Sequence, residues 1–293
     1  MQDVVVKLQG GLGNQMFQYA FSRALSAKLE TDVALDILDY RTASRKFGLG
    51  AFNCALKFSD ESDRRRLRTP FLKLKGELKK IVGLPYSLSP THCKVESFLF
   101  DPSVFDRRPP CYFEGLFQSE KYFSGISGRI RKEFEFARAA EFSAHSLFSE
   151  IISGESVSVH VRCGDYLRRR RTRRILHVCT RSYYERAIEQ ARRRLGNPRF
   201  YLFSDDIALT LKMYEFMRDF VPVEASGDVH EMFLMSRCRH NIIPNSTFSW
   251  WAAWLNPNSE KLVIAPQQWF TPLAGIDYRD VVPESWTKVD TRD

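Results

Sequence analysis

The segment 157-VSVHVRCGD-165 carries a histidine, an arginine and an aspartate at the end of an alternating apolar run. Side chains of a strand point alternately to its two faces, so the valines share one face, and His160 and Arg162 share the other. A guanidinium at the carboxyl end of a strand presents several fixed donors to a diphosphate. A structural alternative stays open: Arg162 pairs with Asp165, and His160 is a satisfied core histidine.

A second polar cluster, Ser204-Asp205-Asp206, directly follows the apolar run 200–203. Its carboxylates and hydroxyl can accept hydrogen bonds from ribose hydroxyls or guanine N–H groups. Capping of the following helix by Asp205 is the alternative, and the sequence alone favours it.

A third segment, 245-NSTFSWW-251, lies at a predicted junction between a strand and a helix. Small hydroxyl residues and backbone N–H groups at a helix N-terminus bind phosphate well. Plain N-capping by Asn245 or Ser246 would need no ligand. The tryptophans Trp250, Trp251 and Trp254 are predicted to lie in the core.

Near the N-terminus the glycine-rich turn 10-GGLGNQ-15 follows a predicted strand. It is not a dinucleotide fingerprint, because Met16 stands where the third glycine would be needed. The chain contains no P-loop, no GxSxG elbow and no DxD motif. The missing DxD argues against the metal-bridged nucleotide-sugar sites that use this motif.

Regular β-α units are expected to position these segments. The predicted strands are 4–8, 33–35, 157–161, 200–203, 220–223, 241–243 and 262–264. The predicted helices are one starting near Gln15 and those at 182–195, 206–217, 229–238 and 246–255. Such repeats predict an α/β fold with parallel sheets, in two Rossmann-like halves that divide near 140–150. The stretch 40–140 gives few interpretable signals.

Each polar segment above lies just after a predicted strand. In open parallel sheets, ligands bind beyond the carboxyl ends of the strands. The sequence therefore predicts ligand binding at this edge of both halves.

The bulk composition narrows the class of partner. A hydrophobic content of 44% with 27% charged residues indicates a globular protein with a real core. A formal charge of +9 favours anionic partners. The run Arg168–Arg174 could grip nucleic acid, but it has no interleaved aromatic residues and no recognised module around it. A solvated loop, or a patch resting on anionic lipid, is the more economical interpretation.

The cysteines and the hydropathy predict a cytoplasmic location. None of the six cysteines forms a CxxC pair or a metal-binding spacing, so we expect free thiols in a reducing compartment. The N-terminus does not read as a signal peptide, and no apolar run is long enough to span a membrane.

Four segments together resemble a known family. VVVKLQGGLGNQMFQYAFSRALS, VSVHVRCGDYL, YLFSDD and MFLMSRCRHNIIPNSTFSWWAAWLN occur in this order. They closely resemble the bacterial α-1,2-fucosyltransferases of glycosyltransferase family 11, and residues 40–140 carry little of the likeness.

The resemblance implies a GT-B-like fold of two Rossmann-type domains facing each other across a cleft. Residues 1–145 would form the acceptor-side domain and 146–293 the GDP-sugar-binding domain. The implied reaction is inverting and needs no metal or other cofactor. L-fucose would pass from GDP-β-L-fucose to a galactoside hydroxyl of a glycan, free or lipid-linked, in α-1,2 linkage. A related GDP-sugar transferase with another donor or linkage is the alternative.

The resemblance also implies roles for residues. Arg162 would hold the β-phosphate, His160 and Asp205 would contact the guanosine, and a carboxylate such as Asp165 would help the acceptor hydroxyl or orient Arg162. The full set of implied donor-binding residues is His160, Arg162, Ser204, Asp205, Asn245, Ser246, Thr247 and Phe248. On the fucose and acceptor side the set is Gly11, Gly13, Asn14 and Gln15.

One position departs from the family pattern. The family usually has two consecutive arginines in the HxRxGDY segment, whereas this chain has Arg162 followed by Cys163. Strand alternation puts Cys163 on the face opposite to Arg162, so the phosphate contact need not be lost.

Overall fold

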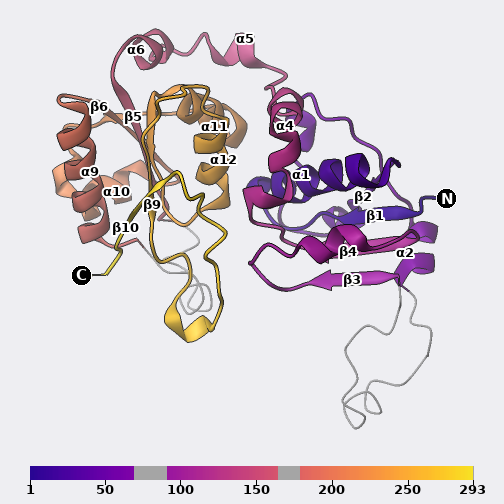
Figure 1. The fold of residues 1–293 in the computed structure, drawn as a ribbon. Helices are drawn as coiled ribbons and strands as arrows, with labels where there is room; N and C mark the ends of the chain where they lie inside the picture. The colour runs from indigo at the N-terminus through magenta and orange to yellow at the C-terminus, as the bar shows by residue number, and fades with distance from the viewer. Residues whose placement is uncertain (69–90, 164–178, 293) are drawn as a thin grey trace. The chain divides into compact units, whose positions relative to one another are not determined.

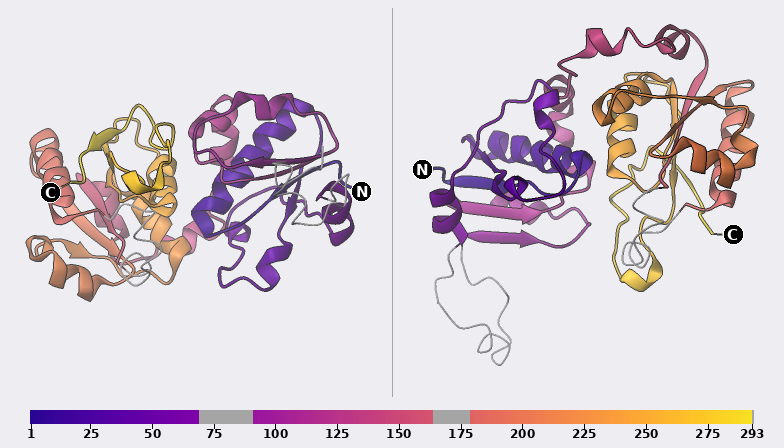
Figure 2. Two further views of the ribbon diagram at one scale, coloured as in Figure 1. Left: turned by 90° about the horizontal axis from the view of Figure 1, so that it is seen from below. Right: turned by 180° about the vertical axis from the view of Figure 1, so that it is seen from behind.

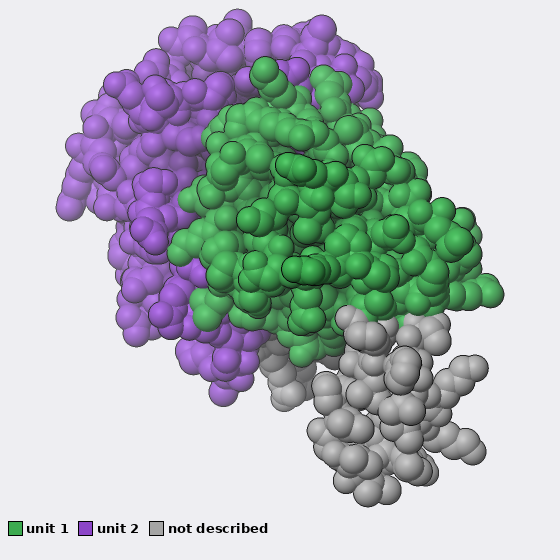
Figure 3. All heavy atoms as spheres, turned by 45° about the vertical axis from the view of Figure 1, so that its right-hand side comes forward, with its two compact units in different colours: residues 1–133 green, residues 134–293 purple. Residues whose placement is uncertain are grey.

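The computed structural model describes residues 1–68, 91–163 and 179–292. The chain divides into two compact units, 1–133 and 134–293, which Figure 3 colours green and purple. The boundary at 145/146 that the resemblance implies lies further along the chain, between the short helices α5 (Ala139–Phe142) and α6 (Phe148–Ser153).

Unit 1 contains a four-stranded sheet in the order β2-β1-β4-β3, and every strand pair is parallel. The strands are β1 (Val4–Lys7), β2 (Ala34–Asp36), β3 (His92–Val95) and β4 (Cys111–Gly115). The α-helices are α1 (Leu12–Leu29), α2 (Glu61–Arg68) and α4 (Ser127–Glu133).

Helices cover both faces of this sheet. In α1 almost every residue from Gln15 to Ser22 is buried, so this helix is covered on all sides rather than amphipathic. On the other face Leu67 of α2 packs against Val5 and Tyr112. Figure 2 shows the long α1 helix running along the strands. It begins at Leu12, earlier than the predicted start near Gln15, because Gly11 takes the N-cap position.

Unit 2 contains a six-stranded, fully parallel sheet in the order β10-β9-β8-β5-β6-β7. Figure 1 labels β5, β6, β9 and β10 of this sheet. Its strands are β5 (Ser156–Val161), β6 (Arg199–Ser204), β7 (Val221–Pro222), β8 (His240–Ile242), β9 (Val263–Pro266) and β10 (Thr287–Val289). Its α-helices are α5 (Ala139–Phe142), α6 (Phe148–Ser153), α9 (Arg181–Leu195), α10 (Ile207–Met213), α11 (Asp228–Arg237) and α12 (Thr247–Leu255).

The two faces of β5 are buried differently. Its valines form one apolar cluster with Tyr183 and Tyr184 of α9. On the opposite face Ser158 accepts a hydrogen bond from Asn241 Nδ2 at 2.7 Å. The predicted alternation along this strand is therefore confirmed. Burial on both faces is what a central strand of a doubly wound sheet requires.

The tryptophans of α12 form part of the core, as predicted. Trp250 and Trp251 are fully buried and Trp254 is nearly so. Trp250 Nε1 donates to the carbonyl of Val281 at 2.8 Å, so its polar atom is satisfied inside the core.

Strand order identifies the ligand-binding end of each sheet. In unit 2 the chain runs outward from β5 through β6 to β7, then returns to β8 on the other side of β5. In unit 1 it runs from β1 to β2, then returns through β3 to β4 beside β1. The switch points, where open α/β sheets bind ligands, thus lie between β5 and β8 and between β1 and β4.

Among the described residues, no helix is long and apolar enough to cross a membrane. All six cysteines are free thiols, as predicted from their spacing.

Candidate active site

Arg162 and Asp205 lie side by side at the carboxyl edge of the unit 2 sheet. The register of β5 with β6 pairs Val161 with Ser204, so the residue after each strand falls next to the other. Arg162 Nε lies 3.8 Å from Asp205 Oδ2, and both side chains are partly exposed. Asp205 Oδ1 also accepts the backbone N–H of Cys163 at 2.8 Å. The guanidinium is therefore positioned by a carboxylate that is itself anchored to the backbone.

Cys163 continues the alternation of β5 and points away from this pair. It is buried in the valine cluster, and its Sγ lies 3.3 Å from Thr210 Oγ1. Burial raises the pKa of the thiol. The departure from the family pattern therefore falls on the core face, while Arg162 keeps its place on the edge.

His160 is not a satisfied core histidine. Its side chain is only 2% exposed, and Nδ1 has no hydrogen-bond partner among the described residues. Burial, reinforced by the charge of Arg162, lowers the pKa of His160 to about 3. The imidazole is therefore neutral at physiological pH, with one ring nitrogen able to donate and the other able to accept. Its ring centroid lies 5.9 Å from that of Phe248, across the switch point.

The expectation that Asp205 caps the next helix is wrong. Asp206 is the N-cap of α10, and its Oδ1 accepts from Leu209 N at 2.9 Å. Ser204 Oγ supports this turn, because it accepts from Asp206 N and lies 2.8 Å from Thr210 Oγ1. Ser204 and Asp206 thus hold the start of α10, whereas Asp205 is directed to the carboxyl edge of the sheet.

The N-terminus of α12 opens beside β5. Ser246 occupies the N-cap position with extended backbone geometry, but its side chain makes no cap hydrogen bond. Asn245 lies one residue before the N-cap, and its Nδ2 donates to the carbonyl of Trp269 at 2.9 Å. The capping alternative is therefore wrong for Ser246. Backbone N–H groups at the start of a helix can bind an anion, and Ser246, Thr247 and Phe248 surround this helix end.

Sequence reasoning missed Glu231 in the first turn of α11. Burial, reinforced by the negative charge of Asp228, raises the pKa of Glu231 to about 7. The charges of Arg162 and Asp205 also act on its carboxylate, which places it near that pair. No described group donates a hydrogen bond to its side chain. The available signal was an acidic residue within the stretch 230–236 of a helix, where every other position is buried.

The predicted acceptor-side residues of unit 1 mainly build their own turn. Gln15 Nε2 donates to the carbonyls of Gly10 and Lys46, and Gln15 Oε1 accepts from the N–H of Gly48. Gly10 has a φ of +83°, and a Cβ there would meet the Asn14 amide at 2.6 Å. Gly11 has open space where a Cβ would lie, and Gly13 is buried in α1. Asn14 Oδ1 accepts from Gln118 Nε2 at 2.9 Å.

Two features that the sequence singled out lie outside the described residues: Asp165 and the run Arg168–Arg174. Across residues 1–68, 91–163 and 179–292, no group of three or more His, Cys, Asp or Glu side chains is arranged to hold a metal ion.

Comparison with known proteins decides the family. The model of glycosyl transferase family 11 matches residues 84–287. The chain belongs to glycosyltransferase family 11. It is therefore a glycosyltransferase, as its four motifs predict.

Two Escherichia coli proteins match this chain over nearly their whole length. An alpha-1,2-colitosyltransferase is 31% identical over 99% of this chain and 100% of the relative. The O-antigen biosynthesis glycosyltransferase WbnK is 30% identical over 95% of this chain and 98% of the relative.

Solved structures share the fold at low sequence identity. Fucosyltransferase NodZ from Bradyrhizobium is 14% identical, with a TM-score of 0.51 over 88% of this chain and 94% of NodZ. POFUT1 in complex with GDP-fucose is 12% identical, with a TM-score of 0.52 over 88% of this chain and 96% of POFUT1. The family 11 chain thus has the expected GT-B-like α/β fold with parallel sheets.

Proposed function

We propose that this family 11 enzyme transfers L-fucose from GDP-β-L-fucose to a galactoside hydroxyl, forming an α-1,2 linkage with inversion. One observation carries the proposal. Arg162, a neutral buried His160 and the N-terminus of α12, where the Ser246 side chain makes no cap hydrogen bond, converge at the switch point between β5 and β8. This combination suits a nucleoside diphosphate, whose charge needs hydrogen-bond donors and whose base needs polar partners.

Each group has a role in this proposal. Arg162 and the N–H groups at the start of α12 bind the diphosphate, with Ser246, Thr247 and Phe248 around it. His160, Asp205 and Glu231 contact the guanosine. A carboxylate is the natural partner of the guanine edge, because it can accept two N–H bonds at once. Ser204 and Asn245 hold the walls of this site through their hydrogen bonds to α10 and to Trp269.

Bond breaking between fucose and phosphate leaves negative charge on GDP. Arg162 and the helix dipole of α12 would stabilise that charge as it develops, so the proposed reaction needs no metal. The acceptor hydroxyl loses its proton to a carboxylate or to the leaving phosphate. Asp165 remains our candidate for that carboxylate, and Asp165→Asn should then lower kcat without changing donor affinity.

The experiment is transfer by the purified protein from GDP-fucose to β-galactosides, with and without EDTA. We expect α-1,2-linked product by NMR and equal rates in both conditions. A protein that neither binds GDP-fucose nor transfers from it would refute the proposal.

One of the comparisons favours a second candidate for the donor sugar. The 31% identical relative is named as a colitosyltransferase, and colitose lacks one ring hydroxyl of fucose. GDP-colitose is therefore the alternative donor. A site that hydrogen-bonds the extra hydroxyl should reject the sugar lacking it, so the ratio of kcat/KM for the two donors separates the candidates.

The acceptor is proposed to be a glycan, free or lipid-linked. A charge of +9 supports peripheral contact with an anionic membrane, where a lipid-linked acceptor would lie. Co-sedimentation with anionic and neutral vesicles at rising salt tests this contact.

A further inference from the structure

Unit 1 has a pocket at its own switch point. A cavity of about 240 Å³ opens beyond the carboxyl ends of β1, β3 and β4. Its lining includes Gln9, Lys94, Glu96, Phe98, Glu114 and Leu116. None of the predicted acceptor-side residues lines it, although Gln9 directly precedes their turn. By the rule that locates ligands at switch points, this is where unit 1 should bind one.

The floor of the pocket is fixed by one buried side chain. Gln18 of α1 accepts the backbone N–H of Gln9 at 2.9 Å and donates to the carbonyl of Gly115 at 3.0 Å. It thereby ties the end of β1 to the end of β4. A Cβ on Gly115 would lie 2.9 Å from the carbonyl oxygen of Val95, so no side chain can stand there. The three strand ends are consequently held at a set spacing.

The segment after β4 is strained. Phe117 has a φ of +50°, which is unfavourable for a bulky residue. Its buried ring stacks on that of Phe21 at a centroid distance of 3.8 Å, and this packing offsets the cost of the backbone conformation. Backbone strain of this kind persists where a neighbouring segment must be held in one position. Here the held segment is Glu114–Leu116, one wall of the pocket.

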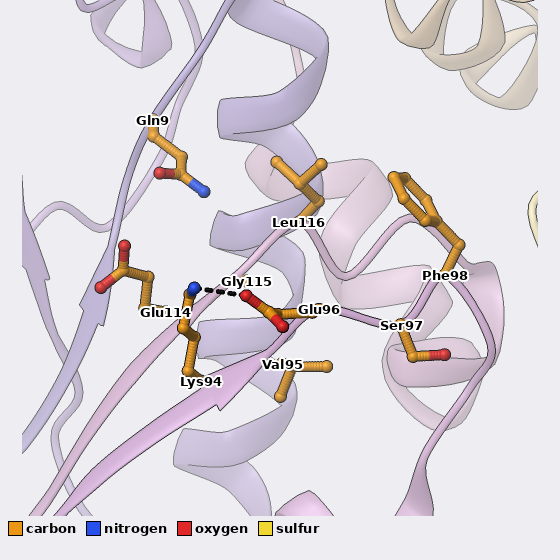
Figure 4. A pocket seen from close by; sticks show the side chains of 9 residues that line it. All are labelled: Gln9, Lys94, Val95, Glu96, Ser97, Phe98, Glu114, Gly115 and Leu116. Carbon is orange, nitrogen blue, oxygen red and sulfur yellow. Dashed lines mark hydrogen bonds and ion pairs between the residues drawn. The ribbon is translucent and has the colours of Figure 1, made fainter. Parts of the chain in front are cut away.

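One wall of the pocket is polar and the other is apolar. Figure 4 shows the Gln9 amide and the Lys94 ammonium on one side, and Leu116 and Phe98 on the other. The amide of Gln9 makes no hydrogen bond within the described ranges. Lys94 forms an ion pair with Glu96. A polar wall facing an aromatic and an aliphatic side chain matches a sugar ring, which has hydroxyls at its edge and C–H bonds on its faces.

The lining offers no unpaired cation to an acidic ligand. The pocket carries two carboxylates and one ammonium, and that ammonium is already paired. Glu114 contacts His92 at 3.2 Å, Lys7 at 3.2 Å and Arg68 at 3.4 Å, and these contacts lower its pKa to about 2. It therefore stays ionised at physiological pH, and its charge is balanced by these neighbours. A neutral ligand fits this lining better than a phosphate or a carboxylated sugar, which would need a cation of its own.

We propose that this pocket binds one neutral sugar ring of the acceptor glycan, with Phe98 against its C–H face and Gln9 and Glu96 bonded to its hydroxyls. The assignment rests on the proposed function and names the acceptor subsite of the same reaction. The cavity lies below the roughly 300–1,000 Å³ of sites for drug-sized ligands, so it holds a single ring rather than an oligosaccharide.

The test uses the full chain with whichever GDP-sugar supports transfer, and N-acetyllactosamine as acceptor. Phe98→Ala and Gln9→Ala should each raise the acceptor KM about fivefold or more, as expected for a lost contact of this kind. The donor KM and the rate of GDP-sugar hydrolysis without acceptor should stay at the wild-type values. Phe58→Ala removes another partly exposed aromatic side chain of unit 1 and serves as the matched control.

Saturation-transfer NMR with methyl β-D-galactoside gives a readout that is independent of turnover. Its signal should fall in both variants and persist in the control. If donor binding and transfer are intact while both variants keep the wild-type acceptor KM and NMR signal, the pocket assignment is wrong and the proposed function stands. If the wild-type protein binds no GDP-sugar, both fail together.

Discussion

Arg162 is the residue on which the proposed donor site depends most directly. Its guanidinium has a fixed planar geometry, and Asp205 orients it toward the strand edge. A hydrogen bond to a charged group contributes about 1.5–3 kcal/mol, so Arg162→Ala should weaken GDP binding by about 10- to 150-fold. Titration calorimetry with GDP checks this. Arg218→Ala, which removes an exposed arginine paired with Glu215, should leave the affinity unchanged. Near-normal binding by Arg162→Ala would remove the assigned role.

The raised pKa of Glu231 predicts how donor affinity depends on pH. Burial raises its pKa to about 7, so in the unliganded protein the carboxylate loses its proton only near neutrality. If the charged form accepts the guanine N–H groups, GDP binding should strengthen as pH rises from 6 to 8. Glu231→Gln should bind GDP more weakly above pH 7 and gain less affinity over this window than the wild-type protein, since only ionisation of the terminal phosphate of GDP, with a pKa of about 6, then remains. A wild-type profile retained in Glu231→Gln would exclude this residue as the cause.

The same carboxylate should cost stability. A folded-state pKa raised above 4.5 means that the native state binds more protons than the unfolded state between about pH 4.5 and 7. Stability from this group therefore falls as pH rises through that window. The penalty is on the order of 2 kcal/mol after discounting for partial exposure. Glu231→Gln should accordingly unfold at higher urea than the wild-type protein at pH 8 and lose this advantage at pH 4.5.

At the scale of elements, the starts of α10 and α12 differ in how they are capped. Asp206 caps α10, whereas the Ser246 hydroxyl caps nothing in the described structure. Asp206→Ala should therefore cost about 1 kcal/mol of stability. Ser246→Ala should cost less than about 0.5 kcal/mol, yet weaken GDP binding about fivefold. Urea unfolding and GDP titration of both variants separate the roles. Equal stability losses would mean that Ser246 is an ordinary cap.

The elements of unit 2 from β5 to α12, and β9, could be predicted because they repeat one pattern, whereas α5, α6 and β10 were not predicted. Short strands precede polar turns, and each of the four predicted helices starts within one residue of its predicted position. One of them ends early: the predicted helix 206–217 stops at Met213 and continues as the 3-10 turn Glu215–Met217. In unit 1, β3 and β4 escaped prediction because their residues do not alternate. His92 and Glu114 contact each other across these two strands, and Arg68 pairs with Glu114, so these contacts exist only in the folded sheet.

The site residues were likewise predictable only where the local sequence fixes their positions. His160 and Arg162 were predictable, since strand alternation and the strand end fix their positions. The sequence could not tell Asp205 from Asp206 as the cap, because that choice depends on the register between β5 and β6. Glu231 and the unit 1 pocket depend on contacts between segments far apart in the chain. Local spacing holds no information about such contacts.

At the scale of the whole molecule, the proposed donor site is confined to one unit. Every proposed donor residue that the structure describes lies between 156 and 248, and the apolar cluster beneath the site belongs to unit 2 as well. Six parallel strands with helices on both faces form a complete doubly wound layer structure. Binding of GDP and assembly of the acceptor site should therefore be separable properties.

We accordingly expect residues 134–293 alone to fold and bind GDP without transferring sugar. Saturating GDP at about 100 times Kd stabilises a folded protein by about 2.7 kcal/mol, which raises the Tm of a domain this size by about 5–10 °C. Differential scanning fluorimetry with GDP measures this shift. Residues 1–133 alone should show no response to GDP, because their pocket carries carboxylates and suits a neutral sugar. A folded 134–293 fragment that ignores GDP would show that unit 1 supplies part of the nucleotide site.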